Sequence, residues 1–142
     1  MNLDIITVIS YDRHYFNLNY EITKKLNVYP HNWVVVENRS KEKHGAYDPQ
    51  KKIIKIKENN IRYIDGIDQD SQNVRVIKKK TLSYSLNPQR SIFHSKGLSL
   101  GIKNSKAKYL LIIDPDFFVV KKNWIKDIIE FMEKKNIDLF SS

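Results

Sequence analysis

Apolar residues along this chain alternate between short β-branched runs and longer amphipathic stretches. Residues 4–10 form a run that is typical of a strand buried on both faces of a sheet. Residues 15–26 place apolar side chains at helical intervals, and residues 33–36 predict a second buried strand. Strand, helix and strand in this order indicate a parallel crossover within an α/β domain.

The second half of the chain continues the alternation. Residues 91–104 predict a helix, residues 108–113 the clearest strand, and residues 124–135 another helix. Asn123 is a natural N-cap for that last helix, and Asn136 can end it. The pattern therefore predicts an alternating α/β architecture.

The middle of the chain has no clear period. We expect a long connection over residues 41–73, in which the alternating residues 53–56 contribute to a small hairpin, followed by a third strand over residues 74–77. The 142 residues suffice for one core and are too few for two ordinary ones. Residues 1–142 are therefore predicted to form a single domain.

Composition narrows the classes of function. The chain is 41% hydrophobic and 29% charged, which is a globular balance, and its lack of cysteine excludes disulfides and thiolate metal sites. A formal net charge of +9 favours anionic partners. The sequence shows neither an export signal nor the roughly 20 apolar residues of a membrane span, so we expect a cytoplasmic protein.

Polar side chains follow three of the predicted strands. They are, in chain order, Ser10, Tyr11 and Asp12, then Glu37 and Asn38, then Asp114 and Asp116. Open α/β sheets bind ligands at the carboxyl ends of their strands. The coincidence of these groups at one sheet edge predicts a ligand site there.

Asp114 and Asp116 are the sharpest chemical feature. Residues two apart in an extended segment point to the same side, so the two carboxylates can converge. Hard oxygen ligands suit Mn²⁺ or Mg²⁺, which keep their other positions for water and phosphate oxygens. The alternative is an Asp-Pro turn that ends a strand and binds nothing.

The residues around this pair resemble the family 2 glycosyltransferases, which have the GT-A fold. A helix ending in Gly101-Ile102 leads through small residues into a strand that is capped by an Asp-x-Asp motif. Gly101 and Asp114 are 13 positions apart (114 − 101), which matches the spacing in the family. Residues 7–12 and 34–40 resemble the ends of its first two strands.

The resemblance implies a Rossmann-like, mostly parallel sheet flanked by helices, incomplete at its C-terminus. It implies a donor site for a nucleotide-diphosphate sugar, in which Tyr11 and Asp12 border the nucleobase and Glu37 faces the base or ribose. Asp114 would lie near ribose and metal, and Asp116 would ligate a metal that bridges the diphosphate. The implied activity is sugar transfer to an acceptor glycan, lipid or protein.

Two departures from the family pattern accompany this resemblance. Leu98-Ser99 stand where the family commonly has Arg-Asn, and Glu37 stands where its second strand usually ends in Asp. The family's catalytic base lies beyond the strand predicted over residues 137–140, and no counterpart is recognisable in this sequence. We therefore expect an N-terminal part of such an enzyme, one that self-associates or is completed by a missing half.

Other interpretations remain open at this point. The chain could be a non-catalytic nucleotide- and metal-binding module, or a basic nucleic-acid-binding protein, although no nucleic-acid module is recognisable. His94 and Arg90 are weaker candidates for phosphate contacts, and Lys78 to Lys80 are candidates for contact with a membrane surface.

Overall fold

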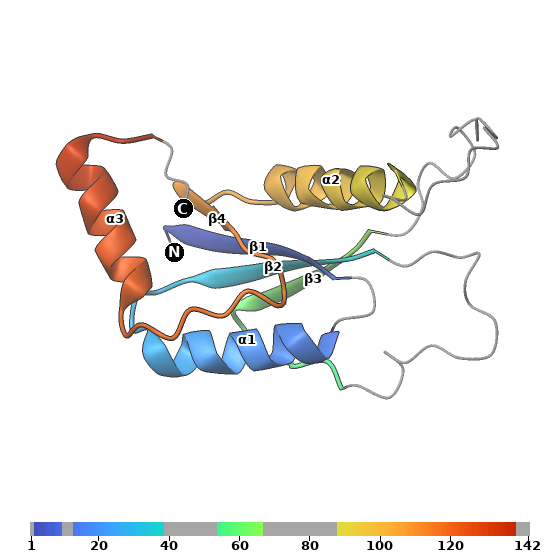
Figure 1. Cartoon of the computed structure of the whole chain (residues 1–142), viewed down its shortest axis with the longest axis horizontal. Coiled ribbons are helices and arrows are strands. Elements are labelled where there is room, and N and C mark those ends of the chain that lie inside the picture. Colours follow the sequence, from blue (N-terminus) through green and yellow to red (C-terminus); the bar gives the residue numbers. More distant parts are fainter. Residues whose placement is uncertain (1, 10–12, 39–53, 67–87, 139–142) are drawn as a thin grey trace.

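A computed structural model describes residues 2–9, 13–38, 54–66 and 88–138 of the chain. Four parallel strands form one sheet in the order β3-β2-β1-β4, with α1 and α2 on its opposite faces (Figure 1). The elements are β1 (Leu3–Ile9), α1 (Arg13–Leu26), β2 (Asn32–Glu37), β3 (Ile61–Asp65), α2 (Pro88–Lys103), β4 (Tyr109–Ile112) and α3 (Trp124–Lys135).

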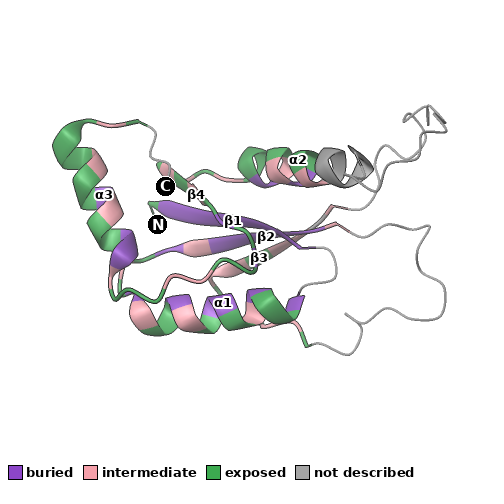
Figure 2. Ribbon diagram, in the orientation of Figure 1, coloured by how far each residue is buried: buried purple, intermediate pink, exposed green. Residues whose placement is uncertain are grey.

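The main core lies between α1 and the sheet. β1 is buried along its whole length (Figure 2), because β2 and β4 flank it and helices cover both its faces. From α1, Phe16 meets Trp33 of β2 edge to face, with 5.4 Å between the ring centroids. Such a pair adds about 1 kcal/mol to the free energy of unfolding beyond the area it buries. The apolar stripe of α1 is therefore anchored on β2.

Two glycines bring α2 onto the other face of the sheet. A Cβ at Gly101 would lie 2.5 Å from Cγ2 of Ile6, and one at Gly97 would lie 2.8 Å from Cγ1 of Val8. Only the absence of side chains at these positions lets the helix backbone approach β1 so closely. Glycine lowers the stability of an isolated helix, but Gly97 and Gly101 are required for α2 to pack on the sheet.

The chain returns from β4 along α1 to α3, which lies at the amino-terminal end of the strands (Figure 1). The amide of Asn123 donates to the carbonyl of Leu26 (2.8 Å), and the amide of Ile125 donates to Oδ1 of Asn27 (3.1 Å). Trp124, Ile125 and Ile129 are buried. The start of α3 is therefore fixed to the end of α1.

Both predicted ends of α3 are confirmed, with one difference in chemistry. Asn123 has a left-handed backbone (φ 57°) and its side chain makes no capping hydrogen bond; its carbonyl instead accepts the amide of Asp127. Asn136 is also left-handed (φ 51°), and its amide donates to the carbonyls of Glu133 and Met132. This is the helix end that asparagine tolerates better than most residues.

The strands predicted over residues 4–10, 33–36 and 108–113 and the helices predicted over residues 15–26, 91–104 and 124–135 are confirmed within a few residues. In the described part of the middle region, residues 54–58 are irregular rather than part of a hairpin, and β3, which was not predicted, pairs in parallel with β2. Residues 74–77 lie outside the described part. Ile137 and Asp138 are not in a strand, and the rest of that predicted strand also lies outside. No helix among the described residues is long and apolar enough to cross a membrane.

Candidate functional site

The predicted polar residues that fall within the described part of the chain lie at the carboxyl edge of the sheet. Glu37 ends β2 opposite Ile9, the last residue of β1, and Asp114 follows β4 on the other side of β1. Neighbouring strands are roughly 4.8 Å apart, so β2 and β4 are about 10 Å apart across the sheet. Along the strand direction β4 ends opposite Ile6, whereas β2 ends opposite Ile9. Ser10, Tyr11 and Asp12 lie outside the described residues.

A side chain of α1 holds the backbone of the turn at residues 114–117. The carbonyl of Asp114 accepts the amide of Phe117 (3.1 Å), and Nδ2 of Asn19 donates to the carbonyl of Phe117 (2.9 Å). Asn19 is buried, and its Oδ1 accepts the hydroxyl of Thr23 at 3.2 Å. Because the amide of Asn19 is fixed on both sides, the turn has a defined geometry rather than that of a loose loop.

The two aspartates on this turn point outward. The side chain of Asp114 is 66% exposed, and Asp116 is also exposed, whereas Pro115 between them is buried. The buried proline anchors the turn while both carboxylates stay accessible. Both carboxylates are therefore accessible to a ligand.

His94 belongs to the same group of side chains. It lies on α2, and its Nε2 is 3.7 Å from Oδ1 of Asp114. Both side chains are partly exposed. The structure therefore brings His94 to the site, whereas the side chain of Arg90 lies outside what is described.

Glu37 lies in a buried ion-pair cluster on the α1 side of the sheet. Its Oε1 accepts Nη2 of Arg13 at 2.5 Å, and its Oε2 accepts the ammonium of Lys55. Burial by itself would raise the pKa of Glu37, but the hydrogen bonds from Lys55 and Arg13 outweigh burial and hold the pKa below its ordinary value. Glu37 is therefore ionised and already paired with two cations.

Tyr63 of β3 completes this cluster. Nζ of Lys55 lies 4.7 Å from the centroid of the Tyr63 ring, within the range of a cation–π contact. Burial, followed by the negative charge of Glu37, raises the pKa of Tyr63 to about 12. The phenol is neutral at physiological pH and serves as an aromatic wall.

Asn38 lies on the opposite face from Glu37. A Cβ added at Gly66 or Gly97 would overlap its side-chain amide, so both glycines leave room for Asn38. The amide of Gly66 also donates to the carbonyl of Glu37 at 3.0 Å. Asn38 is thus held between the end of β3 and α2.

The carboxylates present fit a metal that is shared with a ligand. Within the described ranges, no group of three or more His, Cys, Asp or Glu side chains could hold a metal ion. Asp114 and Asp116 offer two hard oxygen ligands, the number with which Mg²⁺ is commonly held when water and phosphate complete its shell. In the type and number of its ligands, this pair suits such an ion rather than one enclosed by protein alone.

Three residues at this edge were not predicted from the sequence. Arg13 and Lys55 are identified as site residues only by their contacts with Glu37. Arg13 is 24 positions and Lys55 is 18 positions from Glu37 along the chain. Asn19 did leave a signal, because it lies beside Phe16 and Tyr20 on the buried stripe of α1. A polar residue inside a buried stripe indicates a partner that the local sequence does not show.

Neither models of known protein families nor curated proteins match this chain. Among solved structures it is similar to S. aureus TarS residues 1–349, with a TM-score of 0.55 and 15% identity over 96% of this chain and 33% of that one. A second TarS structure gives a TM-score of 0.56 and 14% identity over 96% of this chain and 20% of that one. The complex of TarS 1–349 with UDP-GlcNAc gives a TM-score of 0.55 and 14% identity over 96% of this chain and 32% of that one.

The chain therefore spans a third or less of the TarS chains that it matches. At such low identity the likeness bears on the arrangement of helices and strands alone. A parallel four-stranded sheet flanked by helices, together with these structural neighbours, shows that the chain has a glycosyltransferase-like α/β fold.

Proposed function

We propose that this chain is the donor-binding part of a family 2-like glycosyltransferase. It binds a nucleotide-diphosphate sugar and takes part in transfer of the sugar to an acceptor glycan, lipid or protein. The observation that carries the proposal is the anchored turn that presents Asp114 and Asp116 at the carboxyl edge of a glycosyltransferase-like sheet. The complex of TarS with UDP-GlcNAc supports a nucleotide sugar as the ligand.

Asp114 and Asp116 would hold Mn²⁺ or Mg²⁺. When bound, such an ion supplies Lewis-acid stabilisation of the charge on the leaving diphosphate. The contribution of this chain is to keep two carboxylates accessible, because Asn19 fixes the backbone of the turn and Pro115 anchors it. Because the backbone of the turn is fixed in this way, it loses little conformational entropy when the pair binds a ligand.

The nucleoside end of the donor would lie toward β1 and β2. Ser10, Tyr11 and Asp12 follow β1 in the sequence, and Glu37 and Asn38 are at the end of β2. These strand ends are next to the Asp114 turn, on the side where α/β sheets bind nucleotides. The base and ribose would then occupy the edge between β1 and β2, with the diphosphate toward β4.

Calorimetric titration with UDP tests this proposal. We expect tighter binding with Mn²⁺ than with a chelator, and we expect Asp116→Ala to remove that difference because one hard ligand replaces two. Asp138→Ala is the matched control, since this exposed aspartate follows α3, away from the carboxyl edge. UDP affinity that is equal with and without metal would refute the proposal.

Turnover separates the enzyme from a binding module. A chain that binds UDP in a metal-dependent way but neither transfers nor hydrolyses any sugar donor would be a nucleotide- and metal-binding module. Donor cleavage that requires Asp114 and Asp116 would support the transferase. The measurement is release of UDP from a panel of UDP-sugars.

A further inference from the structure

The end of β2 carries a carboxylate that is already saturated with cations. Each oxygen of Glu37 has a cationic partner, Arg13 on Oε1 and Lys55 on Oε2. The side chains of Glu37 and Arg13 are only 6% and 4% exposed. A ligand at the sheet edge therefore meets neither group directly without breaking a buried ion pair, which is costly.

Lys55 is the accessible member of this cluster. Its side chain is 37% exposed, against 6% for Glu37. An ammonium has three donors, of which one is directed to Glu37 while the ring of Tyr63 flanks the group. The charges of Arg13, Glu37 and Lys55 sum to one positive charge, and Lys55 is the most exposed of these three side chains.

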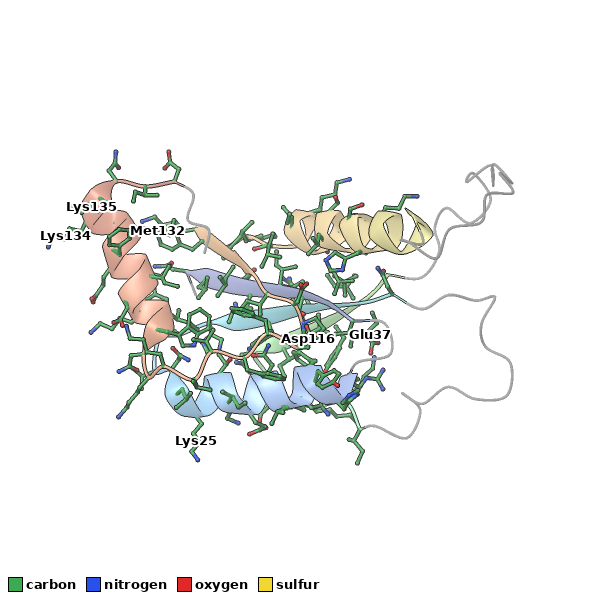
Figure 3. The ribbon with its side chains drawn as sticks, in the orientation of Figure 1. Lys25, Glu37, Asp116, Met132, Lys134 and Lys135 are labelled. Carbon is green, nitrogen blue, oxygen red and sulfur yellow. The ribbon has the colours of Figure 1, made fainter. Side chains whose placement is uncertain are left out.

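The position of Lys55 along the sheet edge indicates which part of a nucleotide it meets. Figure 3 shows Glu37 and Asp116 toward the carboxyl ends of the strands, with Lys134 and Lys135 on α3 at the other side of the molecule. The diphosphate is proposed beside Asp116, which follows β4, and β4 is separated from β2 across the sheet by β1, a lateral spacing of about 10 Å. Lys55, paired with Glu37, is therefore at the nucleoside end.

We infer that Lys55 recognises the nucleobase through the carbonyl oxygen O4 of uracil or O6 of guanine, and that Glu37 acts as a positioning residue that holds the ammonium in place. The inference rests on the proposed function and gives it a base preference. At the edge where uracil has the O4 carbonyl and guanine O6, cytosine and adenine have amino groups. A hydrogen-bond donor at this position favours uracil and guanine, because cytosine and adenine present a donor rather than an acceptor there.

Calorimetric titration of the whole chain with UDP, GDP, CDP and ADP in Mn²⁺ tests the inference. The wild type is expected to bind UDP or GDP at least about tenfold more tightly than CDP and ADP, the size of one charge-assisted hydrogen bond. Lys55→Met keeps the aliphatic stem but removes the donor. Lys55→Met should weaken binding of the preferred nucleotide about tenfold and leave the affinity for CDP unchanged.

Lys57→Met is the matched control, because Lys57 is an exposed lysine in the same irregular segment. It should alter no nucleotide affinity. Lys55→Gln, which keeps a donor without the charge, should lose part of the preference. Glu37→Gln should lower the base preference while the Mn²⁺ dependence of binding persists, a pattern that loss of fold alone would not give. Thermal melts establish that each variant is folded.

The outcomes separate this inference from the proposed function. If Lys55→Met keeps the wild-type ratio of UDP to CDP affinity while binding stays metal-dependent, the inference is wrong and the proposed function stands. A wild type without any base preference also refutes the inference. A chain that binds no nucleoside diphosphate refutes both.

Discussion

Replacing Gly101 by alanine tests the packing of α2 on the sheet. The new Cβ would lie 2.5 Å from Cγ2 of Ile6 and 3.3 Å from Cγ2 of Val36. Carbon atoms in contact prefer about 3.5–4.0 Å, so the first of these distances requires movement. Ile6 is fully buried in β1, between β2 and β4, and its β-branched side chain has little freedom to turn away.

Two opposing effects decide the magnitude. Alanine is favoured over glycine within a helix by up to about 1 kcal/mol. Overpacking a buried contact costs about 1–3 kcal/mol. Because the clash is with a rigid side chain in the central strand, we expect the cost to exceed the gain. Gly101→Ala should therefore destabilise the fold by about 1–2 kcal/mol, which lowers Tm by about 3–6 °C.

Urea denaturation followed by the fluorescence of Trp33 and Trp124, both buried, measures this change. Ser99→Ala is the control, since Ser99 is an exposed residue of the same helix and its replacement should be neutral or slightly stabilising. In an Ile6→Ala background, which lacks the clashing methyl, Gly101→Ala should cost little. A Gly101→Ala chain as stable as the wild type, without coupling to position 6, would refute the close approach of α2.

Three further outcomes are expected. Asn19→Ala should weaken Mn²⁺-dependent UDP binding several-fold by loosening the 114–117 turn, which calorimetry would detect; unchanged binding would contradict that role. The lowered pKa of Glu37 means that its contribution is present above the ordinary value of 4.5 and is lost as pH falls below it. Glu37→Gln should therefore be less stable at pH 7, by about 3 kcal/mol, and flatten the fall in Tm below pH 4.5; parallel Tm profiles would contradict this. Ile112→Lys should reduce self-association of the chain, because Ile112 is 50% exposed on β4, the last strand of the described sheet; light scattering identical to the wild type would contradict it.

The sequence predicted those elements whose burial is uniform or periodic. β1 and β2 are apolar runs because both of their faces are covered, and α1 and α3 bury one stripe each. β3 was missed because Arg62 and Asp65 give Ile61–Asp65 a mixed composition. Its stability comes from parallel pairing with β2, where Ile61 is opposite Trp33. Such pairing is a long-range property that local composition does not report.

The aspartate pair was readable because its chemistry is local: two carboxylates two residues apart, directly after a strand. The hydrogen bond that holds the turn could not be predicted in the same way, because Asn19 and Phe117 are 98 positions apart in the sequence. The same limit explains why Glu37 could be selected as a polar strand end while its cationic partners could not. The partner of a buried charge is set by which segments the fold brings together, and that information is spread over the whole chain.

Alternation along a strand also divides the predicted site into two halves. Glu37 and Asn38 are adjacent in the sequence and were predicted to serve one ligand, but successive side chains point to opposite faces of a sheet. Glu37 accordingly meets Arg13 and Lys55 on the α1 side, whereas Asn38 lies against Gly97 of α2. Asp114, beside His94 of α2, belongs to the second half. A nucleotide sugar bound across this edge would therefore meet Lys55 on one face of the sheet and carboxylate and amide groups on the other. The two ends of such a ligand would be recognised by separate clusters that mutations can test independently.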